Sequence, residues 1–169
     1  MRAFTLIETL VAVFILTIGV LGAFALINQT LNIAPQASYQ LTASYLAQEG
    51  LELVRNIRDN NWLEWRQDTG ILWDRGLTNC ATGCQIDYLS EGLVPYTDSF
   101  LLFHSPDFSD MSFGYQYLSG SASVYKRKIT ITAGTDKLLV SSRVSWQEKG
   151  RAHQVTAQTE LYDWRKLNQ

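Results

Sequence analysis

The chain has 169 residues, of which 46% are hydrophobic and 18% are charged, and its formal net charge is −2. This composition excludes a disordered acidic tail, a strongly basic nucleic-acid-binding protein and a membrane protein with several spans. Two cysteines and two histidines are too few for a disulfide-dense scaffold, a four-cysteine zinc site or a histidine-rich metal centre. The length predicts a single domain.

The charges are divided unevenly along the chain. Residues 9–48 contain none, residues 49–119 contain 4 basic and 11 acidic residues, and residues 120–169 contain 9 basic and 4 acidic residues. Segments of opposite sign can pack together, within one subunit or between neighbours. The simpler interpretation is a solvated acidic region beside a solvated basic sheet, because charge totals alone do not determine a fold.

Residues 4–27 form an apolar segment with a single charge, Glu8. As a helix, this segment would extend about 36 Å, enough to cross the hydrocarbon core of a bilayer. It could be a cleaved secretory signal ending at Ala23-Phe24-Ala25, an uncleaved signal anchor, or a span that later packs against copies of itself. Glu8 favours the third interpretation, because a carboxylate inside an apolar span costs on the order of 3 kcal/mol and is retained for a partner.

The run Ala3-Phe4-Thr5-Leu6-Ile7-Glu8, followed by Thr9-Leu10-Val11-Ala12 and the apolar stretch, resembles the N-terminus of type IV pilin-like prepilins. This family includes pilins, minor pilins and type II secretion pseudopilins. The resemblance implies that a prepilin peptidase removes the leader, residues 1–3, by cutting between Ala3 and Phe4. It further implies that the new amine of Phe4 is methylated and that Glu8 acts in assembly. The family usually has glycine where this chain has Ala3.

Residues 28–60 are expected to continue the helix beyond the membrane. Small and apolar residues recur there every three or four positions and form one face: Ala43, Leu46, Ala47, Gly50, Leu53, Val54 and Ile57. Pro35 is expected to kink or break the helix near residues 31–34, and Asn60-Asn61-Trp62 to end it. A separate span and soluble helix, joined at Pro35, is the alternative. Residues 51–62 also resemble a segment of minor-pilin-like proteins.

The remaining residues predict a β-rich globular part. Residues 61–120 lack a clear period and are interpreted as an irregular, variable region with short strands near residues 71–73, 85–88 and 100–103. Residues 121–169 alternate between apolar and polar side chains, with turn signals at Gly134 and Gly150, which predicts an antiparallel meander. One face of this sheet is expected to cover the helix stripe. The predicted fold class is therefore α+β, with a long N-terminal helix packed on a C-terminal antiparallel sheet.

Cys80 and Cys84 are expected to form a disulfide. Gly83 permits the tight turn that such a short loop needs, and the compartment beyond a membrane span is oxidising. A metal site is not expected, because no His or other Cys lies near them in the sequence.

Two further polar clusters are not expected to be catalytic or to bind nucleic acid. His104, with Ser105, Asp107 and Asp110, reads as a polar surface loop, because a nucleophile motif and calcium-loop spacing are both missing. The run Lys126-Arg127-Lys128 reads as solvent-facing strand charges, with the stem of Arg127 over the edge of the core.

Together these features predict a structural minor subunit of a type IV pilus-like filament, anchored in the membrane before assembly and with an extracytoplasmic C-terminal domain. The expected partners are other pilin subunits, prepilin peptidase, the inner-membrane assembly machinery and the membrane itself. Enzyme activity, a cofactor and a nucleic-acid partner are not expected. The alternatives are a type II secretion pseudopilin and a membrane-anchored adhesin or DNA-uptake module that uses residues 62–119.

Overall fold

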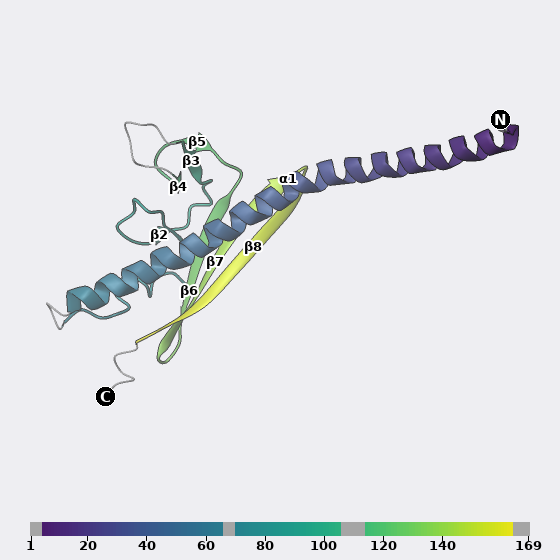
Figure 1. The fold of residues 1–169 in the computed structure, drawn as a ribbon. Coiled ribbons are helices and arrows are strands. Elements are labelled where there is room, and N and C mark those ends of the chain that lie inside the picture. Colours follow the sequence, from purple (N-terminus) through teal and green to yellow (C-terminus); the bar gives the residue numbers. More distant parts are fainter. Residues whose placement is uncertain (1–4, 66–69, 106–113, 164–169) are drawn as a thin grey trace. The chain divides into compact units, whose positions relative to one another are not determined.

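The computed structural model describes residues 5–65, 70–105 and 114–163. The chain divides into two units, Met1–Tyr39 and Gln40–Gln169. One helix, α1 (Leu6–Trp65), contributes to both units, and the described strands all belong to the second (Figure 1). A long helix followed by antiparallel sheets confirms the predicted α+β class.

The first unit is the N-terminal part of α1. Pro35 lies inside this helix, and the helix is not interrupted there. The predicted break near residues 31–34 is therefore wrong. A proline removes one backbone donor and crowds one carbonyl, while the other hydrogen bonds of the flanking turns can still form.

The C-terminal end of α1 lies at Trp65, beyond the predicted end at residues 60–62. Asn61 does not act as a terminator, because its side-chain amide donates hydrogen bonds to Trp73 O (3.0 Å) and Arg75 O (2.9 Å). Trp62 is also buried. Contacts with the following loop thus keep these residues helical and override their local preference to end a helix.

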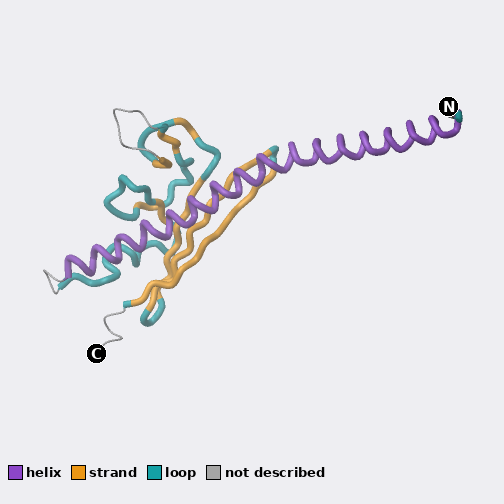
Figure 2. Tube along the Cα trace, in the orientation of Figure 1, coloured by secondary structure: helices purple, strands orange, loops and turns teal. Residues whose placement is uncertain are grey.

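The second unit contains a five-stranded antiparallel sheet with the order β2-β1-β6-β7-β8. Its long strands are β6 (Lys126–Ala133), β7 (Lys137–Glu148) and β8 (Arg151–Tyr162), and successive neighbours pair along their length. These three strands form the predicted meander (Figure 2). Two short strands, β1 (Cys84–Gln85) and β2 (Val94–Pro95), extend the sheet beyond β6.

A second, three-stranded sheet has the order β4-β3-β5 and consists of β3 (Leu102–His104), β4 (Gly114–Gln116) and β5 (Ser121–Ala122). The expected strand at residues 71–73 is wrong, because these residues lie in a loop and a turn. The strands expected at residues 85–88 and 100–103 are shorter and displaced. Strands of two or three residues are held by pairing with distant segments, so local alternation does not reveal them.

The core lies between the second half of α1 and the long strands. Ala43, Leu46, Ala47 and Val54 are buried, as the helix stripe predicts. At Gly50 the helix and the sheet are in close contact, because an added Cβ would lie 2.5 Å from Ser142 Oγ. A larger side chain at position 50 would force the helix away from β7.

Arg127 is the largest of the fully buried side chains among the described residues, so its predicted place at the edge of the core is wrong. The side chains of β6 alternate in burial, and Arg127 lies on the same inward side as Ile129 and Ile131. Its Nη1 donates to Leu46 O (3.1 Å) and lies 3.2 Å from Glu49 Oε2, and its Nη2 donates to Ile86 O (2.5 Å). Burial is tolerated because two carbonyls and a carboxylate face the two terminal nitrogens of the guanidinium group. Its Nε has no hydrogen-bond partner among the described residues.

We expect Arg127→Met to lower the free energy of unfolding of the second unit by about 2–4 kcal/mol, because it removes charge-assisted hydrogen bonds from buried carbonyls. Denaturant titration of the full chain, followed by near-UV circular dichroism, measures this loss. Arg143→Met is the matched control. Arg143 is exposed on the neighbouring strand opposite Lys128, so its replacement should change stability by less than about 0.5 kcal/mol. Equal effects of the two substitutions would contradict the structural role of Arg127.

Candidate functional site

The first turn of α1 is capped by residues of its own sequence. Thr5 precedes the helix, and Glu8 is the third helical residue. Glu8 Oε2 accepts weak hydrogen bonds from the Thr5 backbone N–H (3.4 Å) and the Thr5 hydroxyl (3.5 Å). A carboxylate that reaches back in this way from the third helical position belongs to the capping-box pattern. The unpaired N–H groups at a helix start also favour a negative charge at this place.

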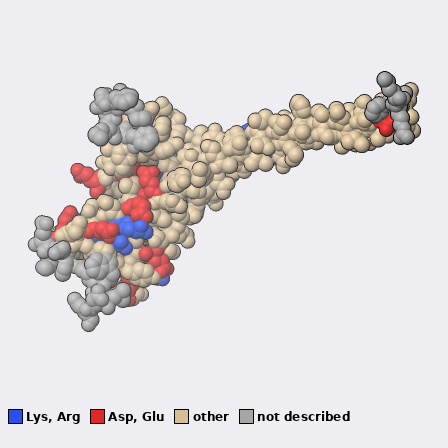
Figure 3. Space-filling model, in the orientation of Figure 1, with Lys and Arg blue, Asp and Glu red and all other residues tan. Residues whose placement is uncertain are grey.

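The helix after Glu8 presents apolar side chains to the outside around its whole circumference. From Leu6 to Ile33 the large hydrophobic side chains of α1 are half or more exposed. Apart from Glu8, residues 5–39 carry no charge (Figure 3). Within the described parts of the chain, α1 is the helix that is long and apolar enough to cross a membrane. Apolar surface of this extent needs a lipid or protein cover.

The threonine hydroxyls in this apolar segment are satisfied by the helix itself. Thr9 and Thr17 donate to the carbonyls three residues earlier, both at 2.8 Å, and Thr30 donates to Leu26 O at 2.9 Å. A hydroxyl bonded to its own backbone does not need water. These residues therefore leave the segment compatible with an apolar surrounding.

The expected processing site lies outside the described residues, because Ala3 and Phe4 precede Thr5. The structure thus locates Glu8, but not the amine that cleavage at Phe4 would create. Thr5 was missed as a partner of Glu8 in the sequence analysis. The spacing Thr-x-x-Glu at the start of an apolar run is the signal that could have identified it.

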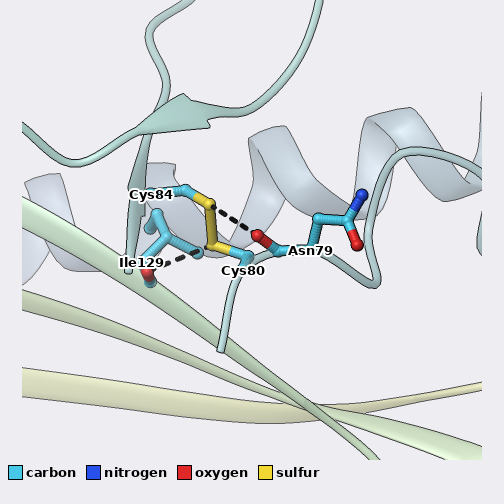
Figure 4. The surroundings of a disulfide bond; sticks show 4 residues. All are labelled: Asn79, Cys80, Cys84 and Ile129. Carbon is cyan, nitrogen blue, oxygen red and sulfur yellow. Dashed lines mark hydrogen bonds between the residues drawn. A yellow bond between two sulfur atoms is a disulfide. The ribbon is translucent and has the colours of Figure 1, made fainter. Parts of the chain in front are cut away.

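Cys80 and Cys84 are joined by a disulfide bond, with 5.5 Å between their Cα atoms. Both are buried in the main core. Figure 4 shows Cys80 Sγ beside Ile129 O, at 3.3 Å. Gly83 has a φ of +121°, and a Cβ there would lie 2.1 Å from Lys128 Cε. The backbone conformation and the close approach of Lys128 both favour glycine at this turn.

The structure describes part of the polar cluster around His104. His104 is a half-buried residue of β3, while Asp107 and Asp110 lie outside the described residues. Among the described residues, no group of three or more His, Cys, Asp or Glu side chains could hold a metal ion.

A cavity of about 460 Å³ lies where β6 begins and β7 ends, and Asp98, Phe100, Lys126 and Trp146 form part of its wall. Lys126 Nζ contacts Asp98 Oδ2 at 2.7 Å and lies over the Phe100 ring. The hydrogen bond from Lys126, followed by that from Tyr96, lowers the pKa of Asp98. Burial and the bond to Asp98 raise the pKa of Tyr96. Asp98 therefore stays ionised, and its pairing with Lys126 leaves this wall close to neutral.

A family model described as the prokaryotic N-terminal methylation motif matches residues 1–24. No match was found among curated proteins or among solved structures. The matched residues contain the Ala3–Phe4 junction, Glu8 and most of the exposed apolar helix. Within the matched part, the described residues 5–24 form a capped, exposed helical segment whose one charge is Glu8.

We expect the mature protein to begin at Phe4 and to carry a methyl group on the Phe4 amine. Intact-mass and N-terminal peptide mass spectrometry of protein from the native host measures both features. The resemblance to prepilins implies a scissile bond directly before the Phe-Thr-Leu-Ile-Glu run. A mature chain beginning at Leu26, after Ala23-Phe24-Ala25, would instead indicate an ordinary signal peptide.

We expect neither Cys80 nor Cys84 to react with a thiol reagent when the unreduced protein is unfolded. Reduction should lower the free energy of unfolding by about 2 kcal/mol, because the closed loop is short and the entropic effect of the cross-link is small. Quantitative labelling, with a reduced sample as the control, measures the first effect. Complete labelling without reduction would contradict the disulfide.

Proposed function

We propose that this chain, whose residues 1–24 match the prokaryotic N-terminal methylation motif, is a type IV pilin-like prepilin and serves as a structural minor subunit of a type IV pilus-like filament. The motif implies processing by a prepilin peptidase and assembly with other pilins, and it points to a structural protein. The apolar helix and the motif together support anchoring in a membrane by a single span. The resemblance of residues 51–62 to a segment of minor-pilin-like proteins supports the minor role.

The observation that carries the proposal is Glu8 within the exposed N-terminal segment of α1, because residues 5–39 carry no other charge. In the membrane, lipid covers the apolar side chains. In a filament, the apolar segments of neighbouring subunits take the place of lipid, so the same surface serves both states. A carboxylate is costly in either place, and its retention at the first turn needs a function.

In this proposal, Glu8 forms a charge pair with a cation on a neighbouring subunit. A buried carboxylate without a counter-charge costs several kcal/mol, and residues 5–48 contain no Lys or Arg. The nearest positive charge after processing is the amine of Phe4. Glu8 follows Phe4 by four residues, which is about 6 Å along a helix axis. A neighbouring subunit displaced along the axis can therefore place its Phe4 amine beside Glu8. This pairing would stabilise the correct axial register of the two helices relative to other registers.

The Thr5 groups give Glu8 partners before assembly. The hydrogen bonds from Thr5 satisfy part of the carboxylate within one subunit, but they do not neutralise its charge. A neighbouring amine can do so while Thr5 stays in place. Glu8 is thus held at the first turn of the helix, and its charge remains available to a second subunit.

We expect Glu8→Ala to reduce entry of the protein into sheared extracellular filaments by at least about tenfold, since the charge pair in the filament core is lost. Membrane insertion and the fold of the second unit should be unchanged. Glu8→Asp, whose side chain is one methylene shorter but keeps the charge, should reduce filament entry less than Glu8→Ala. Glu52→Ala, which removes an exposed helical carboxylate of the second unit, is the control. Immunoblots of sheared filaments and of membranes measure the two fractions.

Normal incorporation of the Glu8→Ala protein would contradict a role of Glu8 in register. A subunit at the filament tip has no neighbour above it and escapes this requirement, so the blot is read together with the position of the subunit by immunogold labelling. If neither the native protein nor the variants occur in sheared filaments, the filament-subunit function itself is wrong.

A further inference from the structure

The two edges of the five-stranded sheet differ in their capacity to accept another strand. One edge is β2, which has two residues and includes Pro95. Proline cannot donate a backbone hydrogen bond, and a very short edge strand is a common protection against pairing. The other edge is β8, which has twelve residues, and no other strand of the described chain pairs with its outer side (Figure 1).

The β7–β8 hairpin determines which backbone groups of β8 face outward. Its two-residue loop is Lys149-Gly150, with φ values of +48° and +76°, as in a type I′ turn. The flanking pair Glu148–Arg151 is then a hydrogen-bonded pair, and such pairs alternate along an antiparallel ladder. The odd-numbered residues of β8 therefore bond to β7, while the even-numbered residues direct their N–H and C=O groups to the open side.

The outer side of β8 lacks the residues that usually prevent pairing. Residues 152–159 contain no charge, no proline and no glycine. The side chains of Gln154, Thr156 and Gln158 are exposed, and these polar side chains can form hydrogen bonds with like residues on a neighbouring strand. A long edge of this composition is a template for strand addition.

We propose that β8 is a docking edge for a second copy of this chain, which adds its own β8 in the antiparallel direction with Thr156 opposite Thr156. In this register Gln154 lies opposite Gln158, and Val155 lies opposite Ala157. The uncharged stretch of one copy pairs with that of the other.

The charges at the two ends of β8 favour the antiparallel direction. Arg151 and Glu160 bound the uncharged stretch and have opposite signs. In the proposed register Glu160 lies opposite Ala152, and Arg151 lies opposite Leu161, so no like charges face each other. A parallel pairing in register would place each charge beside its own copy and would be disfavoured. The edge is therefore complementary to itself.

This interface is separate from the proposed function. Filament entry depends on the first unit and Glu8, whereas the β8 pairing uses strands of the second unit alone. A variant that loses one property should keep the other. Dimerisation and filament incorporation are therefore measured independently on the same proteins.

The first test compares Thr156→Pro with Thr156→Val in the full mature chain, solubilised in detergent and analysed by sedimentation velocity over a range of concentrations. Proline removes the outward N–H at the centre of the pairing without removing a bond to β7, while valine keeps the backbone donor. We expect a dimer in the native and Thr156→Val proteins, and an association constant at least about tenfold lower for Thr156→Pro. A native monomer, or equal dimerisation of both variants, overturns the proposal. Circular dichroism verifies that Thr156→Pro is folded.

The second test uses single engineered cysteines, since the two native cysteines are bonded to each other. A Thr156→Cys pair would have Cα atoms about 5.5 Å apart, within the range of a disulfide. Gln158→Cys is the matched control, because its copies would lie about 14 Å apart along the strands. Mild oxidation should give a covalent dimer at least about tenfold more efficiently for Thr156→Cys than for Gln158→Cys. Equal cross-linking at both positions, or none at Thr156, overturns the register.

Discussion

The buried guanidinium group of Arg127 fixes the arrangement of the second unit. It donates to Leu46 O on α1 and to Ile86 O after β1, and it pairs with Glu49. An apolar stripe on a helix can slide along an apolar sheet at small cost in free energy. The hydrogen bonds from Arg127 to Leu46 O and Ile86 O, in contrast, form only at one position of the helix on the sheet. Such a charge is expensive to bury and is tolerated only where its partners are in place. The polar cluster therefore selects the position at which Gly50 meets Ser142.

Strand β6, which carries Arg127, also connects the three-stranded sheet to this polar cluster through Tyr117, the residue after β4. The hydroxyl of Tyr117 donates to Arg127 O at 3.2 Å, and the Tyr117 N–H donates to Asp87 Oδ2 at 2.8 Å. Asp87 is buried, and its other oxygen accepts hydrogen bonds from Leu89 N and Ser90 Oγ. Burial raises the pKa of Tyr117, so its hydroxyl stays protonated and able to donate. Helix, large sheet and small sheet thus meet at polar groups whose hydrogen bonds are mutually supportive.

The sequence predicted those parts of this arrangement that repeat along the chain. Alternation in residues 121–169 identified the meander, and the helix stripe identified the helical side of the core. The short strands depend on pairing between distant segments, so no local period marks them. Arg127 shows how a residue type can mislead, because its position in the β6 alternation indicated an inward side chain while its charge suggested the surface. Charge segregation was partly informative: Arg127–Glu49 and Lys126–Asp98 join the basic and acidic segments, whereas Lys137–Glu160 lies within the basic one.

In the first unit, by contrast, the threonine hydroxyls are satisfied within the helix itself. Each threonine hydroxyl at positions 9, 17 and 30 bonds to a carbonyl of its own helix, and Thr5 donates weak hydrogen bonds to the Glu8 carboxylate. These threonines can exchange lipid for protein neighbours without exposing an unpaired hydroxyl. Hydrogen bonds to Glu8 leave its negative charge uncompensated, however. Dispersion forces between apolar helices hold many registers almost equally well, so in the proposed filament this charge is the group that can distinguish one register from another.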